Sequence, residues 1–187
     1  IDFLNIQEDE FNYRNVNDLA SSSSAWDRTT RVINWTNSNY LTYDNTWKEI
    51  HYFKGMIGQS SQRSKTTGFG LTGYDFPNDY LTNPSDAPAE NQSGYSYEQA
   101  QSLLSYFARF NYKLNNKYLF NVSLRGDGSS KFGPNNKWGF FPAGSVGWVV
   151  SDENFMKGSK AVPYLKLSAS YGLSGNDQIP NYAFQAL

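Results

Sequence analysis

The sequence of this 187-residue chain predicts an all-β fold of antiparallel strands, from the pattern of its side chains and from its composition. Three segments alternate strictly between apolar and polar residues, which directs successive side chains to opposite faces of a strand. The clearest alternation places Leu165, Leu167, Ala169, Tyr171 and Leu173 in one phase and Lys166, Ser168, Ser170 and Gly172 in the other. Aromatic residues reach 17% although only 39% of residues are hydrophobic and the mean hydropathy is −0.65. Both a transmembrane barrel and a Tyr-rich secreted β-sandwich have such strands, and composition alone leaves the two open.

The strand segments follow one another with connections of alternating length. We expect the end of a strand over residues 1–10 and full strands over 28–43, 48–62, 99–113, 118–127, 138–150 and 164–173. Short turns are expected near 44–47 and 114–117, and longer connections over 11–27, 63–98 and 128–137, with a helical turn in 151–162 as a partial exception. A structureless loop of 36 residues (63–98) is out of place in a compact soluble domain. Short turns on one side and long loops on the other are typical of outer-membrane barrels.

In a barrel, the polar phase of each strand faces the lumen, because Arg or Lys facing lipid at the midplane would cost about 2–4 kcal/mol. Candidate lumen-facing residues are therefore Arg109, Asn111, Arg125, Asp127 and Lys166. They would either grip solute or a plug domain, or satisfy one another as an internal ladder of ion pairs, which is the interpretation we favour. The apolar phase should face outward; it comprises Leu104, Tyr106, Phe110, Phe120, Val122, Leu124, Leu165, Leu167 and Tyr171.

Aromatic residues in the expected long loop form a second candidate site. Tyr74, Phe76, Tyr80 and Tyr95 lie among Asp, Asn and Gly residues, with Tyr97 close by. Exposed rings in such a setting suit stacking on sugars or contact with a protein. Packing of the loop against itself is the alternative, and the sequence leaves both open.

Several function classes are excluded or disfavoured. A net charge of −1 without a basic run gives no footprint for nucleic acid. With no Cys and with His51 as the single histidine, we expect no metal site. Residues 68–73 spell G-x-G-x-x-G, but turn residues rather than a helix follow, so we expect no cofactor. The carboxylate pairs Asp152–Glu153 and Asp75–Asp79 fall in expected loops without an apolar setting, so we predict that the chain is not an enzyme.

Sequence motifs in the C-terminal half resemble those of a known family. The stretch RGDGSSKFGP from Arg125, the stretch NKWGFFPAGSVGW from Asn136, and LKLSASYG from Leu165 with Gly175-Asn176 after it appear in this order. Together they resemble the C-terminal barrel region of SusC/RagA-type TonB-dependent outer-membrane transporters. The resemblance is best over residues 99–176 and looser over 28–80.

The resemblance implies a large plugged barrel of the 22-strand type, of which this chain supplies about six to seven strands. Residues 1–187 are then a partial barrel domain, expected to lack the plug and the N-terminal regions. The implied place is the cell outer membrane of a Bacteroidetes-type bacterium, as a multi-pass barrel in contact with lipid. The implied function is nutrient uptake: import of oligosaccharide or peptide cargo with a SusD-like surface lipoprotein, energised by the TonB complex through the missing N-terminal part. The alternative is a secreted β-sandwich glycan-binding module.

Overall fold

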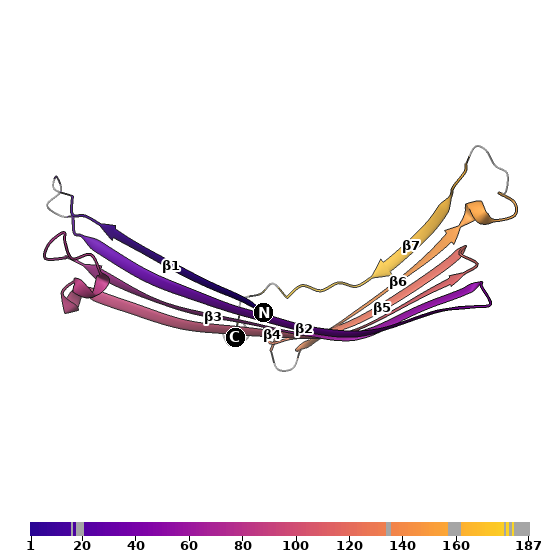
Figure 1. The fold of residues 1–187 in the computed structure, drawn as a ribbon, viewed down its shortest axis with the longest axis horizontal. Helices are drawn as coiled ribbons and strands as arrows, with labels where there is room; N and C mark the ends of the chain where they lie inside the picture. The colour runs from indigo at the N-terminus through magenta and orange to yellow at the C-terminus, as the bar shows by residue number, and fades with distance from the viewer. Residues whose placement is uncertain are drawn as a thin grey trace. The chain divides into compact units, whose positions relative to one another are not determined.

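A computed structural model describes residues 1–15, 17, 21–133, 136–156, 162–177, 179 and 181. The described chain forms seven strands: β1 (Asp2–Asn12), β2 (Ser24–Trp47), β3 (His51–Tyr74), β4 (Gln92–Leu114), β5 (Tyr118–Ser129), β6 (Trp138–Val149) and β7 (Lys166–Gly172). They are hydrogen-bonded in chain order, β1 to β7, as one sheet (Figure 1). Three short 3-10 helices complete it: η1 (Pro84–Asp86), η2 (Ala89–Asn91) and η3 (Val150–Asp152). No helix in the described ranges is long and apolar enough to span a membrane.

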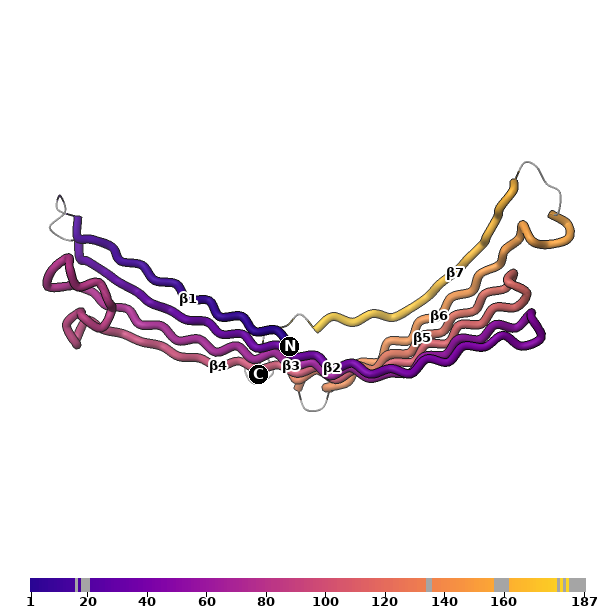
Figure 2. The backbone as a smooth tube through the Cα atoms, in the orientation of Figure 1, coloured from indigo at the N-terminus to yellow at the C-terminus, as the bar shows by residue number. Residues whose placement is uncertain are grey.

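The chain divides into two compact units. Unit 1 comprises Ile1–Trp35 and Arg63–Gln101, and unit 2 comprises Thr36–Gln62 and Ser102–Leu187. Strands β2, β3 and β4 contribute residues to both units, β1 belongs to unit 1, and β5, β6 and β7 belong to unit 2. In unit 2 the backbone trace shows β5, β6 and β7 as successive neighbours (Figure 2).

The register in unit 2 sorts side chains into two faces. Directly opposed residues of antiparallel strands share a face. Pairing of β4 with β5 sets Phe107 opposite Arg125 and Ser105 opposite Asp127 on one face. On the other face the pairs are Ala108 with Leu124, Phe110 with Val122, and Tyr112 with Phe120. The predicted separation of Leu124 from Arg125 is therefore confirmed, and we call the two surfaces the apolar face and the polar face.

Among the residues that the structure describes, no second layer covers the apolar face of unit 2. All seven strands of the described chain belong to the same sheet. Large apolar side chains on this face stay open: Val122 is 47% exposed and Leu167 is 53% exposed. A β-sandwich needs a second sheet packed on the first to bury such residues. The sandwich alternative therefore does not describe this fold.

Two tight turns join strands at the short-connection end. The β4–β5 turn has Asn115 and Asn116 at φ 53° and 56°, where the sequence predicts it. Two consecutive residues of positive φ define the hairpin turn that matches strand twist, and Asn is well suited to it. The β2–β3 turn uses Lys48 and Glu49 instead, at φ 50° and 61°. Its predicted position at 44–47 is wrong, because β2 continues to Trp47.

The long loop predicted over 63–98 is also wrong. Strand β3 continues to Tyr74 and β4 begins at Gln92, so the connection covers only residues 75–91 and contains η1 and η2. The Gly-rich composition predicted a loop, but Gly68 and Gly70 are strand residues that lie beneath aromatic rings. A Cβ at Gly68 would lie 2.4 Å from the Tyr97 ring, and a Cβ at Gly70 would lie 2.7 Å from the Tyr95 ring. Glycine in a strand leaves room for such close approach. The G-x-G-x-x-G match thus lies inside β3.

A small core lies in unit 1. Ala25, Phe76 and Ala87 are buried together, and Phe11 packs against them, its ring centroid 5.2 Å from that of Phe76 in an edge-to-face arrangement. The backbone N–H of Phe76 donates to the Ser23 hydroxyl at 2.9 Å, and the N–H of Asp75 donates to the Ser23 carbonyl at 2.9 Å. These contacts attach the 75–91 connection to the start of β2. Phe76, expected to be exposed, is only 6% exposed.

The described part of the β6–β7 connection contains one short helical turn. That turn, η3, covers Val150–Asp152, within the region where a helical turn was expected. Strand β7 begins at Lys166, so Leu165 precedes it, and the Leu165 carbonyl accepts a hydrogen bond from the N–H of Ser151 at 3.2 Å.

Candidate functional site

The polar face of unit 2 brings together two of the predicted lumen-facing residues. Arg125 and Asp127 alternate along β5 on this face, and the Arg125 Nε donates to both carboxylate oxygens of Asp127 at 2.8 Å. The Arg125 Nη2 also donates to the hydroxyl of Ser105 at 3.2 Å, from the neighbouring strand β4. Ser105 is 1% exposed, whereas the Arg125 side chain is 48% exposed. The guanidinium is thus held in place and still presents donors to whatever lies above the sheet.

A second polar cluster on the same face contains Arg109 and Asn111. Both line a shallow hollow of about 460 Å³ together with residues of β5, β6 and β7, among them Asn121, Ser145 and Ser170. The Asn121 amide donates to the Ser145 hydroxyl at 2.9 Å. The hydroxyls and amides in its lining offer both donors and acceptors to a polar solute.

Lys166 lies on the polar face as well, as predicted from its phase. It is opposite Val149 in the β6–β7 register, and its Cε is 3.3 Å from the position that a Cβ at Gly147 would take. The expected ladder of ion pairs is present only in part. The contacts described on this face include the Arg125–Asp127 pair, the hydrogen bond from Arg125 to Ser105, and hydrogen bonds between neutral groups such as Asn121 and Ser145.

Sequence reasoning missed Phe107, a large ring in the polar phase. A Cβ at Gly58 would lie 2.6 Å from the Phe107 ring and 2.8 Å from the Asn39 carbonyl. The ring therefore crosses β3 at a position without a side chain. The only signal in the sequence is a lone aromatic residue in a polar phase, and the glycine that accommodates it lies 49 positions earlier in the chain.

The apolar face of unit 2 is bounded by two groups of aromatic residues. Near the short turns, the rings of Trp47, His51, Phe53, Tyr112 and Phe120 are in mutual contact. Toward the other end of β4 and β6, Tyr106 stacks on Trp138 with 6.0 Å between ring centroids. In β6, Trp138 and Trp148 mark the two limits. Ten residues at ~3.4 Å each, tilted by ~40°, span about 26 Å, close to the ~25 Å apolar band of outer-membrane barrels.

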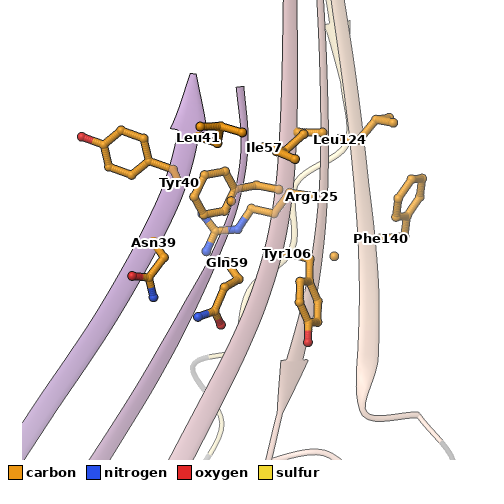
Figure 3. Close-up of a pocket in the computed structure, with 13 residues that line it drawn as sticks. Asn39, Tyr40, Leu41, Ile57, Gln59, Tyr106, Leu124, Arg125 and Phe140 are labelled. Carbon is orange, nitrogen blue, oxygen red and sulfur yellow. The ribbon is translucent and has the colours of Figure 1, made fainter. Parts of the chain in front are cut away.

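Between the aromatic groups lies an apolar hollow of about 740 Å³ (Figure 3). Leu41, Ile57, Tyr106, Leu124 and Phe140 line it from five different strands. Tyr106, Leu124 and Phe140 belong to the apolar face by register, and the hollow is shallow and open. Its lining suits acyl chains and offers few groups that could orient a polar solute.

His51 takes part in the aromatic group rather than in chemistry. Its Nδ1 lies 2.8 Å from the Tyr112 hydroxyl, and its ring is stacked with that of Tyr112. Among the described residues no cluster of three or more His, Cys, Asp or Glu side chains has the arrangement of a metal site.

Glu153 connects three polar groups at the short-connection end. The Tyr118 hydroxyl donates to Oε1 at 2.7 Å, the Trp148 indole N–H to Oε1 at 3.2 Å, and the Lys117 ammonium to Oε2 at 3.2 Å. The hydrogen bond from Tyr118, then that from Trp148, holds the pKa of the Glu153 carboxyl below its ordinary value. A carboxylate so occupied is a structural anchor, and the neighbouring Asp152 accepts from Ser151 at 3.5 Å. This arrangement differs from an acid–base pair, in which one carboxyl has a raised pKa.

The predicted loop aromatics of unit 1 do not share one environment. Tyr80 is 94% exposed in the 75–91 connection, and Tyr74 at the end of β3 is 46% exposed. Tyr95 lies in β4 rather than in a loop and is 54% exposed, and its ring stacks with that of Tyr97 at 6.3 Å. Phe76 is buried and cannot be an open contact surface.

A single antiparallel sheet with one polar face and one uncovered apolar face between aromatic groups is the wall of a transmembrane β-barrel. The comparisons with known proteins agree. The chain is 34% identical over 189 residues to the TonB-dependent receptor P39 of Formosa agariphila, covering 95% of this chain and 18% of that protein. It is 38% identical over 128 residues to the TonB-dependent receptor SusC of Bacteroides thetaiotaomicron, covering 68% of this chain and 12% of that protein. No family model matches.

Solved structures give the same fold. The structure of the RagAB peptide transporter matches 96% of this chain with a TM-score of 0.89 at 24% identity, and the match covers 20% of that chain. The chain belongs to the SusC/RagA-type TonB-dependent receptors, and it spans about a fifth or less of the length of the relatives it matches. These relatives are named as receptors and transporters rather than enzymes, in agreement with the prediction.

Proposed function

We propose that this chain forms part of the barrel wall of an outer-membrane importer, with the apolar face of unit 2 toward lipid and the polar face toward the lumen. The observation that carries the proposal is the apolar face itself, bounded in β6 by Trp138 and Trp148, which lie about 26 Å apart along the membrane normal when strands tilt by ~40°. Bulky apolar side chains exposed in water would favour aggregation, whereas acyl chains give them a matching solvent.

The proposed cargo is a nutrient oligosaccharide or peptide, taken up through a full-length barrel energised by the TonB complex and paired with a SusD-like surface lipoprotein. The names of the relatives support this: two are TonB-dependent receptors, one of them SusC, and the RagAB structure is titled a peptide transporter. Arg109, Asn111, Arg125, Asp127 and Lys166 would line the solute side of the wall. Tyr74, Tyr80 and Tyr95 would contact cargo or lipoprotein on the outer side, where the longer connections lie. Phe76 would instead stabilise the 75–91 connection.

The orientation of the two faces is tested with neighbouring cysteines. The chain contains no Cys, so Leu124→Cys and Arg125→Cys each introduce one reactive site, in a full-length protein with any other thiols replaced. In liposomes, we expect Leu124→Cys to react with a lipid-soluble maleimide and to resist a charged thiosulfonate. We expect Arg125→Cys to show the reverse. Equal reactivity of both positions toward the charged reagent would refute the membrane placement.

Transport is tested in the source bacterium by deleting the gene. Growth is compared on single polysaccharides and on peptide mixtures as the only carbon source. Loss of growth on one nutrient, restored by the wild-type gene, identifies the cargo. Unchanged growth and uptake on every nutrient would contradict an import function.

A further inference from the structure

Two tyrosines of β4 lie over glycines of β3 in unit 1. The Tyr97 ring passes over Gly68 and the Tyr95 ring over Gly70, in each case so closely that a Cβ on the glycine would overlap the ring at 2.4 and 2.7 Å. Any side chain at residue 68 or 70 would displace the tyrosine above it. The positions of both rings are therefore set by the pair of glycines beneath them.

The two rings form a continuous surface. Their centroids are 6.3 Å apart and their planes differ by 12°. Tyr95 is 54% exposed and Tyr97 is 41% exposed, although both cross a neighbouring strand. We call this pair with its two glycines the tyrosine platform. A rigid, exposed pair of parallel rings offers apolar area at little cost in conformational entropy, because each ring is already held in place.

A group of charged and polar side chains in unit 1 lies within electrostatic range of the platform. Arg28 of β2 is within electrostatic range of both Tyr95 and Tyr97. Its Nε donates to Glu8 at 2.8 Å, and its guanidinium lies over the Trp26 ring at 4.6 Å. The Trp26 indole N–H donates to Glu10 at 3.0 Å. The charges thus have partners within the group, and what remains for a ligand is a set of carboxylate acceptors and guanidinium donors.

We propose that the tyrosine platform is a binding site for a neutral oligosaccharide, a proposal that rests on the import function above and names its cargo class. A pyranose ring has an apolar C–H face and a rim of hydroxyls. Such faces stack on aromatic rings, and hydroxyls both donate to carboxylates and accept from guanidinium. Two adjacent parallel rings suit two consecutive sugar units. An anionic or cationic peptide would instead call for an unpaired opposite charge, and Arg28 is paired with Glu8 in this group.

The test uses the full-length transporter, purified in detergent with its lipoprotein partner. Probes are linear hexasaccharides of α-1,4-glucose, β-1,4-glucose, β-1,3-glucose and β-1,4-xylose, and a pool of random nonapeptides, each followed by calorimetry and saturation-transfer NMR. We expect one hexasaccharide to bind and the double variant Tyr95→Ala/Tyr97→Ala to bind it about tenfold more weakly, since each stacked ring contributes a modest share. Gly68→Ala/Gly70→Ala keeps both tyrosines but displaces their rings, and we expect a similar loss.

Two matched controls separate the platform from general damage. Tyr95→Phe/Tyr97→Phe retains both rings and should retain most of the affinity. Lys65→Ala removes the ion pair between Lys65 of β3 and Glu98 of β4. By strand alternation this pair lies on the face opposite the platform, so the variant should keep the wild-type affinity. Heat-shifted gel migration verifies that every variant forms a folded barrel.

The proposal is overturned if no hexasaccharide binds, if the double alanine variant binds as the wild type does, or if only peptides bind. Its failure is distinguishable from failure of the import function. Growth that is lost on deletion but unaffected by the alanine pair refutes the platform alone. Binding through the tyrosines without any deletion phenotype refutes import and leaves the platform in place.

Discussion

The two compact units differ in whether large apolar side chains are buried against one another. Unit 2 leaves large apolar side chains such as Val122 and Leu167 about half exposed, and its most buried residue on the sheet is a serine, Ser105. Unit 1 has a small conventional core in which Phe76 is buried with Ala25 and Ala87. The usual rule that large apolar groups are buried holds for this core of unit 1, but it does not hold for the strand residues Phe3 and Phe69 of unit 1, which are 62% and 55% exposed, or for the apolar face of unit 2. The difference is explained if lipid takes the place of a core for unit 2, since acyl chains solvate what water would not.

Both units use glycine for the same purpose. Gly58 in unit 2 accommodates Phe107, and Gly68 and Gly70 in unit 1 accommodate Tyr97 and Tyr95. All three glycines lie in β3 and all three rings come from β4. A strand glycine that would otherwise weaken the sheet is thereby covered by the aromatic residue of its neighbour. Composition alone makes such a strand look like a loop.

The largest loss of stability is expected when the core of unit 1 is removed. We expect Phe76→Ala to destabilise the 75–91 connection by about 3–5 kcal/mol, because it leaves a cavity against Ala25 and Ala87. Pulsed proteolysis on intact cells should show cleavage within 75–91, while the barrel still migrates as a folded species. Tyr80→Ala, at a fully open position, is the control and should leave protease resistance unchanged. Equal resistance of the Phe76 variant would show that the core does not hold the connection.

A charge on the apolar face of unit 2 is expected to have the next largest effect. Val122 lies opposite Gly144, which lies between Trp138 and Trp148 in β6. Val122→Arg should reduce the free energy of unfolding in liposomes by about 2–4 kcal/mol, measured by urea titration of the full-length protein. Asn121→Arg, one residue away on the polar face, loses only its bond to Ser145 and should cost about 1 kcal/mol. A larger cost at Asn121 than at Val122 would reverse the assignment of the faces.

Two glycines of β3 test whether a glycine is needed beneath an aromatic ring of β4. Gly58→Ala places a Cβ against the Phe107 ring and the Asn39 carbonyl, and we expect a loss of about 1–3 kcal/mol from overpacking. Gly55→Ala meets nothing within 4 Å and should stabilise by about 0.4–1 kcal/mol by restricting the unfolded chain. Thermal unfolding of the two variants side by side measures the contrast. Similar effects at both positions would mean that Phe107 does not depend on Gly58.

The smallest expected effect concerns pH and the Glu153 anchor. Because hydrogen bonds from Tyr118 and Trp148 lower the pKa of Glu153 in the folded protein, its contribution is present above the unfolded pKa of ~4.3 and is lost as pH falls through the folded value. The unfolding temperature of the wild type should therefore fall more between pH ~5 and ~3 than that of Glu153→Gln. Asp152→Asn, at the residue directly before Glu153, should show the same fall in unfolding temperature as the wild type. Parallel curves for wild type and Glu153→Gln would exclude the anchor as a source of acid sensitivity.

Much of the fold was predictable because alternation acts locally. The phases of β4, β5 and β7 follow from period-two patterning, and Asn115-Asn116 predicts its turn because Asn tolerates positive φ. The β2–β3 turn was misplaced because Lys48 and Glu49 carry no such signal, and their conformation is imposed by the strands on either side. The 63–98 loop was wrong for a related reason: glycines and tyrosines marked a loop, and only the neighbouring strand shows that they complement one another.

The sequence by itself determined which side chains share a face, because a strand points alternate residues in opposite directions whatever surrounds it. It also determined the family, since the sequence motifs that begin at Arg125 and Asn136 are specific to that family. Only the tertiary structure decided that Phe76 is buried, that Arg125 meets Asp127 and Ser105, and that Tyr95 and Tyr97 form one surface over Gly70 and Gly68. Those outcomes depend on strand register, which brings residues far apart in the chain within a few ångströms and which no local pattern encodes.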